Sequence, residues 1–456
     1  MKKLFLLSFI AFALLAPAQA PVRSDTSLFS AAEWSTIHTL SPLPALPTDT
    51  TNKYADSPAA ALLGQKLFFE PRLSGPIQAG TRKEGQLGDI GDKGKIACRN
   101  CHMPESRWLF DIRSNNETDI SNATALGSQW MTRNASSVAN TVFYVNKSGA
   151  HWRENDGYAD SEWFDAQSEP EGPQVQNGSR LQLAHVIFEH YRREYNRAFP
   201  EWPLNDATAL ADYKRFPATG SPYTDEPNWR TLSAADKEII NRILVNYGKA
   251  MEAYLRKLVS RNAPFDRYVA GKSWAISADA KLGLKLFIGK AGCVRCHNGP
   301  NFSDDDFHVI GLKINTIHSH ADPAEPGRSA NQSLICDPAT AGGDFSVNGH
   351  FSDDPATRRD GDFCKQKISV GLWRTKSLRQ VAETAPYFRD GQYRTLDDVI
   401  RFYDRGGDPD GSYLGGPKEI QPLHLSGDEK RQLREFLKTL TGDPVPAKYL
   451  RDLHNP

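Results

Sequence analysis

Residues 95–102, KIACRNCH, place two cysteines three positions apart with a histidine directly behind them. The same CxxCH pattern returns at residues 292–297, GCVRCH, and the whole chain has only six cysteines. Such a motif fits a zinc site, a redox dithiol, a disulfide or the covalent attachment site of a haem. Because the pattern occurs twice, the correct chemistry has to account for a pair.

A second repeat indicates that the chain contains two related modules. The sequence GQKLF at residues 64–68 precedes the first CxxCH motif, and GLKLF at residues 283–287 precedes the second. The spacing is longer in the first half, where residues 75–95 are rich in Gly, Lys and Asp and poor in apolar residues. We interpret that stretch as an extra loop of the first module.

Of the four chemistries, zinc and a redox dithiol fit poorly. A structural zinc site needs four ligands, but the two motifs lie far apart in modules that each look complete, and a dithiol needs neither the histidine nor a second copy. CxxCH matches c-type haem attachment, in which the thiols bond the vinyl groups and the imidazole binds the iron. We therefore expect two covalently bound haems. Their residues are Cys98, Cys101 and His102 in the first motif and Cys293, Cys296 and His297 in the second.

The first twenty residues indicate export. They combine Lys2 and Lys3, an apolar run at residues 4–16 and the small-residue sequence at 18–20, as secretory signal peptides do. The run is shorter than the roughly 20 residues that span a bilayer, and no later segment is apolar enough to do so. With 55 basic and 55 acidic residues, the charge does not recruit nucleic acid. We expect a periplasmic protein.

Helical periodicity predominates along the chain, and alternating strand patterns are scarce. We therefore expect a mainly α fold of two cytochrome c-like haem domains with long loops. The helices expected most clearly cover residues 181–199, 233–260, 395–405 and 426–440, and residues 262–274 look like a domain connection. The expected division is a signal peptide at 1–20, a domain with the reactive haem at 21–265 and a domain with the electron-transfer haem at 266–456.

The two remaining cysteines, Cys336 and Cys364, lie in a long insertion rich in Asp and Gly. In an oxidising compartment we expect them to form a disulfide, which would contribute on the order of 3 kcal/mol by closing a loop. Two buried free thiols are the alternative.

The ligand on the side of the iron opposite the proximal histidine decides how a haem behaves. A methionine or histidine closes the iron for electron transfer, while an open face admits peroxide. The methionines are Met1, Met103, Met131 and Met251, so the second module cannot supply one to its own haem. From the residues alone, the candidates for its sixth ligand are a histidine, a lysine and a tyrosine.

Several longer blocks resemble the bacterial dihaem cytochrome c peroxidase and MauG family. The similarity covers roughly residues 55–445, and several of its motifs are specific. In chain order the blocks are GQKLFFEPRLSG (64–75), CRNCH (98–102), RNASSVANTVFY (133–144), HWRENDGYADSEW (151–163), GCVRCHNGPNFSDDDFHVIG (292–311) and SLRQVAETAPYFRDGQYRTLDDVIRFYDRGG (377–407).

The resemblance supplies a sixth ligand for the second haem. In the peroxidases the helix after the APYFxDG segment bears a methionine ligand, whereas in MauG-like members a tyrosine takes that place. The aligned residue here is Tyr403, which agrees with the missing methionines and is closer to the MauG-like branch. A phenolate would stabilise oxidised iron. A buried helical tyrosine that contacts no iron is the alternative.

The first haem is expected to be open. Resting peroxidases of this family use a distal histidine shortly before the RN motif, but residues 126–134, LGSQWMTRN, contain none. The resemblance therefore implies an open or water-closed haem on His102, with Met131 as the alternative ligand.

Residues around the haems also take roles from the resemblance. Trp152 corresponds to the tryptophan between the two haems, which can relay electrons. Asn134, with the backbone carbonyls of Thr384 and Pro386, matches a calcium site between the domains, and oxygen ligands of this kind suit calcium. Core packing for Trp152 and a turn role for Asn134 are the alternatives.

One departure from the family concerns the open face of the first haem, where members carry a glutamine and, ten residues later, a glutamate. A gapless match places Asp165 and Val175 there, and Glu169 and Glu171 lie nearby. We take Asp165 and Glu171 as the candidate acids beside Trp152. Acid–base help is typically worth about 10²- to 10⁴-fold, so losing it would weaken peroxide turnover.

These features predict a periplasmic dihaem oxidoreductase that reacts with hydrogen peroxide at the first haem and oxidises an aromatic residue of a partner protein, as MauG-like members do. One alternative is a cytochrome c peroxidase that reduces peroxide to water with electrons from a small donor protein. A second is a non-enzymatic dihaem electron carrier.

Overall fold

The structure is a computed structural model that describes residues 28–78, 87–109, 126–131, 133–144, 161–314, 327, 329, 343–347, 349–355 and 369–454. The predicted signal peptide, Trp152 and the pair Cys336 and Cys364 lie outside these residues, so the relay and the disulfide stay predictions. No helix within the described ranges combines the length and apolar character needed to cross a membrane.

The described chain is mainly helical, which confirms the predicted fold class. The only strands within it pair as a short antiparallel ladder, with Phe307 opposite Arg374. The helices are α1 (Ala31–Thr39), α2 (Pro58–Phe68), α3 (Glu162–Ser168), α4 (Arg180–His190), α5 (Arg192–Ala198), α6 (Glu226–Arg230), α7 (Ala234–Leu255), α8 (Pro264–Val269), α9 (Ala278–Ile288), α11 (Leu396–Asp404) and α12 (Gly427–Lys438), and the strands are β1 (Phe307–His308) and β2 (Trp373–Arg374).

Most predicted helices are present. Ser233 caps α7, as expected, by accepting a hydrogen bond from the Asp236 amide, and α11 and α12 fall within their predicted ranges. Two predictions differ from the structure. The helix expected at 181–199 is broken at Tyr191, whose φ of −129° and ψ of 10° are not helical, and the expected connection at 262–274 contains α8.

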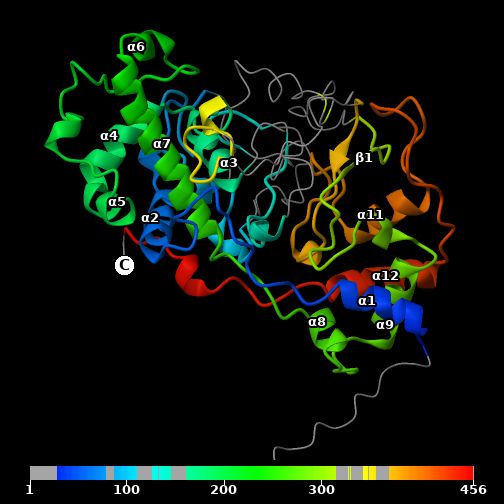
Figure 1. Ribbon diagram of the computed structural model, residues 1–456. Coiled ribbons are helices and arrows are strands. Elements are labelled where there is room, and N and C mark those ends of the chain that lie inside the picture. The colour runs from blue at the N-terminus through cyan, green and yellow to red at the C-terminus, as the bar shows by residue number, and fades with distance from the viewer. Residues whose placement is uncertain are drawn as a thin grey trace, which may run out of the picture.

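The first module is built on the crossing of α2 and α7, which lie together on the left of Figure 1. Gly64, the glycine of the first GxKLF repeat, makes the close approach possible. A Cβ at this position would lie 2.0 Å from the Ala250 carbonyl oxygen of α7. On the other side of α7, Gly248 allows similar contact with the Trp163 carbonyl of α3.

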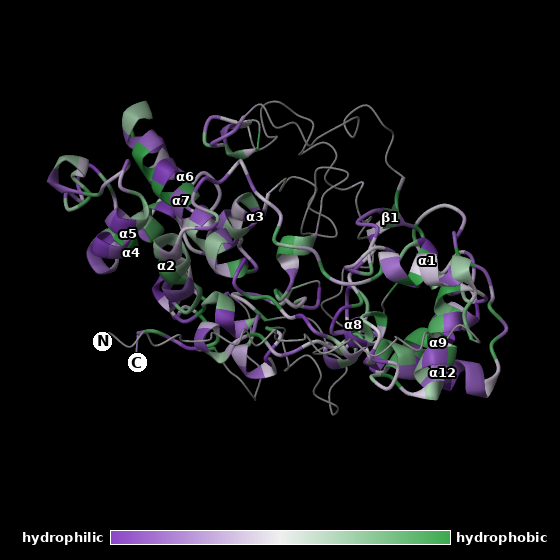
Figure 2. Ribbon diagram, turned by 60° about the horizontal axis from the view of Figure 1, so that its bottom comes forward, coloured by the Kyte–Doolittle hydropathy of each residue, from purple (hydrophilic) through white to green (hydrophobic). Residues whose placement is uncertain are grey.

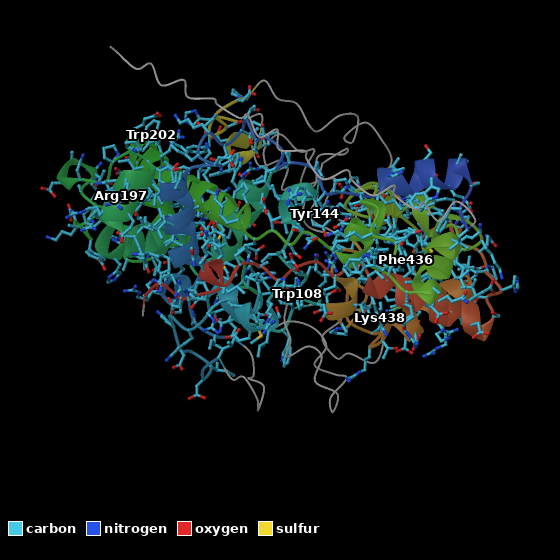
Figure 3. The ribbon with its side chains drawn as sticks, turned by 90° about the horizontal axis from the view of Figure 1, so that it is seen from below. Trp108, Tyr144, Arg197, Trp202, Phe436 and Lys438 are labelled. Carbon is cyan, nitrogen blue, oxygen red and sulfur yellow. The ribbon has the colours of Figure 1, made fainter. Side chains whose placement is uncertain are left out.

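The second module repeats this crossing with α9 and α12, and Figure 2 shows the two helices against each other from another direction. Gly283, the glycine of the second GxKLF repeat, sits where a Cβ would lie 2.0 Å from the Gln432 carbonyl oxygen. Phe436 of α12 fills the core beside it, next to Phe265, Phe287 and Phe302. Figure 3 shows Phe436 in one lobe and Arg197 and Trp202 in the other. The two repeats therefore perform the same packing task.

The two ends of the described chain pack across the modules. Phe29, Ile37 and Leu40, from α1 and its flanks, belong to the core of the second module. Val445, with Tyr449 and Leu450 beside it, packs into the core of the first. The predicted division at residue 265 stays a prediction, and each core includes a segment from the far end of the sequence.

A buried hydrogen-bond network joins the modules where the chain passes between them. Asn140 and Ser260 bind each other through both the backbone amide and carbonyl of Ser260, at 2.8 and 2.9 Å. The amide of Gln380 donates to the Ser260 hydroxyl at 3.0 Å. This network ties the first module to the segment at Gln380, directly before the 3-10 turn Val381–Glu383 of the second.

Candidate haem-attachment sites

The first CxxCH motif forms a single tight turn. Residues Cys98–Asn100 form a 3-10 helix, and the Cys101 and His102 amides donate to the Cys98 carbonyl at 3.2 and 2.9 Å. The turn therefore presents both thiols and the imidazole together. Burial raises the pKa of the Cys98 thiol to about 11, whereas reactive dithiols have lowered pKa values.

A hydrogen bond at Nδ1 orients the His102 ring. Nδ1 lies 2.9 Å from the Ser136 carbonyl oxygen, and this contact makes Nδ1 the protonated nitrogen. Nε2 is then the unprotonated nitrogen, which is the form that binds a metal. Ser136 belongs to the RNASSVANTVFY block, so that block positions the first proximal histidine.

The second CxxCH motif has the same geometry. Residues Cys293–Arg295 form a 3-10 helix after Gly292, whose φ of 61° favours glycine, and the His297 amide donates to the Cys293 carbonyl at 2.9 Å. His297 Nδ1 lies 3.0 Å from the Phe302 carbonyl oxygen. Burial lowers the pKa of His297 and raises that of the Cys293 thiol to about 12.

Tyr403 lies near this second motif. It is the next-to-last residue of α11, and its ring packs against Phe388 and Phe402. Burial and then the nearby Cys293 and Cys296 raise its pKa above the ordinary value. Among the described residues, none gives the Tyr403 hydroxyl a hydrogen bond. A half-buried phenol near a CxxCH motif, with no hydrogen bond from the described residues, fits the predicted ligand role.

Two other histidines that follow the second motif, His308 and His350, contact acidic side chains. His308 contacts Asp304 at 2.9 Å and Glu419 at 2.6 Å. A hydrogen bond with Cys296, and then the two acids, raise its pKa to about 10 although burial opposes the shift. The trio Cys296, Asp304 and His308 places its ligand atoms within 4.8 Å of one another, one ligand short of a structural zinc site. His350 contacts Glu238 at 3.1 Å.

The comparisons with known proteins agree with this geometry. The family model for di-haem cytochrome c peroxidase matches residues 58–274. Cytochrome-c peroxidase IdrP1 of Pseudomonas sp. (strain SCT) is 28% identical over 409 residues, covering 88% of this chain and 85% of the relative. The methylamine utilization protein MauG of Methylorubrum extorquens is 28% identical over 391 residues, covering 85% and 80%. The chain is thus similar to dihaem cytochrome c peroxidases and MauG proteins over most of its length.

A further relative covers less of its own length. Cytochrome-c peroxidase IdrP2 of Denitromonas iodatirespirans is 38% identical over 216 residues, which span 46% of this chain and 52% of the relative. Two solved structures share the fold. A MauG-like protein associated with microbial copper homeostasis has a TM-score of 0.55 at 22% identity, covering 91% of this chain and 99% of that one. The diheme peroxidase BthA from Burkholderia thailandensis has a TM-score of 0.52 at 20% identity, covering 85% and 87%.

The similarity to dihaem proteins implies two c-type haems, and the residues present fit them. Each motif offers two thiols, a turn that holds the imidazole next to them, and a carbonyl that fixes Nδ1 of the ring. The second motif also has the phenol of Tyr403 nearby. The described residues therefore provide proximal ligands for two irons.

The predicted calcium residues come partly together. The Asn134 side-chain amide donates to the Pro386 carbonyl at 2.8 Å, and its backbone amide donates to Arg389. The Asn134 Oδ1 atom is buried without a partner in the described part of the chain. Thr384 follows the 3-10 turn Val381–Glu383, two residues before Pro386. An orphaned amide oxygen beside a carbonyl fits a hard cation.

The two candidate acids have different environments. Both carboxylate oxygens of Glu171 accept hydrogen bonds from the Arg180 guanidinium, at 2.7–3.1 Å, and both residues are buried. This pairing gives Glu171 a structural task between η7 (Glu169–Glu171) and α4. Asp165 is buried in α3. Among the two, Asp165 is thus the better candidate for proton movement.

Two glutamines near the predicted positions were missed by the sequence reasoning. Gln167 and Gln176 lie within two residues of Asp165 and Val175, and both are buried with a side-chain oxygen that has no partner in the described ranges. The Gln176 amide also donates to the Ile96 carbonyl at 3.1 Å, two residues before Cys98. A shift of two residues in the gapless match reaches Gln167 and a shift of one reaches Gln176, so no single shift finds both.

Proposed function

We propose that this protein is an exported dihaem oxidoreductase that uses hydrogen peroxide to oxidise an aromatic residue of a partner protein. The observation that carries the proposal is Tyr403, a half-buried phenol near Cys293 and Cys296 with no hydrogen-bond partner among the described residues. Bound haem would supply the redox chemistry with peroxide at the first motif. The signal-like sequence at residues 1–20 supports a periplasmic location.

The chain's own residues would divide the work as follows. His102 and His297 would bind iron through Nε2, since Nδ1 of each contacts the carbonyl of Ser136 or Phe302. Tyr403 would close the second site and stabilise oxidised iron. Trp152 would relay electrons between the sites, and Asp165 is the acid that remains to move protons at the first.

A second candidate function is that of a cytochrome c peroxidase, which reduces peroxide to water with electrons from a small donor protein. The relatives named cytochrome-c peroxidase favour it. Tyr403 and the absence of a histidine from residues 126–134 favour the MauG-like activity. A non-enzymatic electron carrier is the third candidate, and it needs no open haem.

Mixing the holoprotein with hydrogen peroxide and following the haem spectrum separates the three candidates. A long-lived oxidised state in the absence of donor supports the MauG-like function. Rapid return to the ferric spectrum when a small donor protein is added supports the peroxidase. A spectrum that ignores peroxide supports the carrier and contradicts our proposal.

A further inference from the structure

A buried tyrosine in the first module lies between a carboxylate and an imidazole. The Tyr191 hydroxyl contacts both Glu70 Oε2 and His454 Nε2 in close hydrogen bonds. The side chains of Glu70 and Tyr191 are 1% and 3% exposed. The haem sites described above use none of these three residues, so the network needs another explanation.

Both neighbours of the hydroxyl are themselves held in place. Arg72 donates to both oxygens of Glu70, at 2.7 and 2.6 Å, and lies 3.4 Å from the Tyr191 hydroxyl. Asp452 lies 2.6 Å from His454 Nδ1. The phenol has one hydrogen, which it donates to Glu70, so the contact with His454 Nε2 holds the phenol oxygen from the other side.

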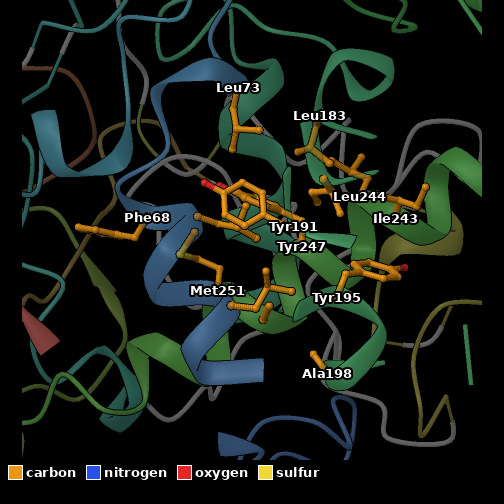
Figure 4. Packing of buried hydrophobic residues seen from close by; sticks show 14 of the residues in the cluster. Phe68, Leu73, Leu183, Tyr191, Tyr195, Ala198, Ile243, Leu244, Tyr247 and Met251 are labelled. Atoms are coloured by element: carbon orange, nitrogen blue, oxygen red, sulfur yellow. The ribbon is translucent and has the colours of Figure 1, made fainter. Parts of the chain in front are cut away.

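The network shares a hydrophobic core with the first haem-attachment motif. Tyr191 and Tyr247 belong to the same core cluster, where Figure 4 shows both rings among Leu73, Leu183 and Met251. Cys98 packs against this cluster, and the Tyr247 hydroxyl lies 3.9 Å from Cys98 Sγ. The core that contains Tyr191 therefore reaches the cysteine that would carry the first haem.

From this arrangement we infer that Tyr191 is a redox-active residue that gives an electron to the first haem after peroxide has oxidised it, while Glu70 takes its proton. The inference rests on the proposed function, because peroxide is the oxidant. In the step, Tyr191 loses one electron and the oxidised haem gains it. The phenolic O–H bond breaks and an O–H bond forms at Glu70 Oε2, which leaves a neutral tyrosyl radical and a carboxylic acid.

Glu70 is the group placed to take the proton, because the Tyr191 hydroxyl donates its hydrogen bond to Glu70 Oε2. Burial raises the pKa of Glu70, but hydrogen bonds from Arg72 and Tyr191 outweigh it, so the pKa is lowered overall. Glu70 is therefore ionised in the resting protein and can accept the proton. The phenol itself stays protonated in the resting protein, because burial and then Glu70 raise its pKa.

The test uses the haem-loaded full chain with ring-deuterated tyrosine. Peroxide is added, samples are frozen within seconds and electron paramagnetic resonance is recorded, with the haem optical spectrum followed in parallel. We expect a radical signal that narrows on deuteration, is lost in Tyr191→Phe and falls several-fold in Glu70→Gln. Tyr195→Phe is the matched control, since Tyr195 lies in the same cluster but has the Asn246 amide as its partner.

The outcomes separate the two proposals. A haem spectrum that responds to peroxide without a tyrosyl signal, or with the same signal in Tyr191→Phe, overturns the inference alone. A haem spectrum that ignores peroxide overturns the proposed function and the inference with it. If Tyr191→Phe does not fold, Glu70→Gln decides, because an unchanged radical yield in that variant rules out the assigned proton acceptor.

Discussion

A single substitution tests the assignment of Tyr403 as an iron ligand. Tyr403→Phe keeps the packing against Phe388 and Phe402 but removes the oxygen that would bind iron. We expect the absorption and magnetic circular dichroism bands of one haem to change and those of the other to stay. Tyr393→Phe is the control, because Tyr393 lies against the same rings but binds Arg405. An unchanged spectrum in Tyr403→Phe would remove the ligand assignment.

Glu162 makes stability depend on pH. Burial, aided by Asp165 and Asp49 and opposed by Thr141 and Arg256, raises its pKa to about 7 from 4.5. The folded state therefore binds this proton more tightly than the unfolded state, and stability falls as pH rises from about 4.5 to about 7. Glu162→Gln should remove up to about 3 kcal/mol of that loss.

The measurement for Glu162 is urea unfolding of both proteins at about pH 5 and about pH 8. The variant should gain stability relative to the natural protein at the higher pH and differ little at the lower. Equal differences at the two pH values would show that Glu162 does not titrate in this range.

At the residue scale, prediction succeeded where the chemistry is local. The CxxCH residues fall within five consecutive positions, so their turn follows from the sequence itself. Glu171 was taken as an acid because no pattern reveals that Arg180, nine residues later, neutralises it. The Tyr191 network joins residues 70, 191 and 454, and separations of this size leave no sequence signal.

Among the elements, the two GxKLF helices have the most specific packing. Gly64→Ala would bring a Cβ within 2.0 Å of the Ala250 oxygen, and Gly283→Ala within 2.0 Å of the Gln432 oxygen. Backbone atoms would have to move, so we expect each change to cost about 1–3 kcal/mol or more and to disturb chiefly the haem of its own module. Thermal unfolding and the two haem spectra measure this.

Gly427→Ala is the control for the helix crossings. Gly427 begins α12, and a Cβ there would meet nothing within 4 Å. This substitution should leave stability unchanged or raise it slightly. If all three variants behaved alike, the crossings would not explain the repeated glycine.

The sequence predicted the helices better than their contacts. Spacing of apolar residues and the cap at Ser233 were enough to place α7. The break at Tyr191 was missed because both flanking segments are good helices, and the position is decided by the hydroxyl's partners. The glycine repeat was recognised as a pattern, but only the crossing in space shows why no side chain fits.

For the whole molecule, the proposed calcium ion would lie where the modules meet. Removing calcium with a chelator should lower the thermal stability of the holoprotein, because Asn134 Oδ1 and the Pro386 carbonyl lose a shared cation. Asn134→Ala should abolish the response to calcium. Asn177→Gly is the control, since the Asn177 amide also donates to a proline carbonyl, that of Pro76, but within the first module.

A calcium response that persists in Asn134→Ala would place the ion elsewhere. The same melting temperature with and without chelator in the natural protein would remove the calcium site altogether.

The exchange of chain ends between the modules sets an order of events during synthesis. Residues 445–450 complete the core of the first module, yet they are made after every helix of the second. The first core must therefore stay incomplete until the last segment has been made. Its thiols, Cys98 and Cys101, would stay accessible for haem attachment throughout that interval.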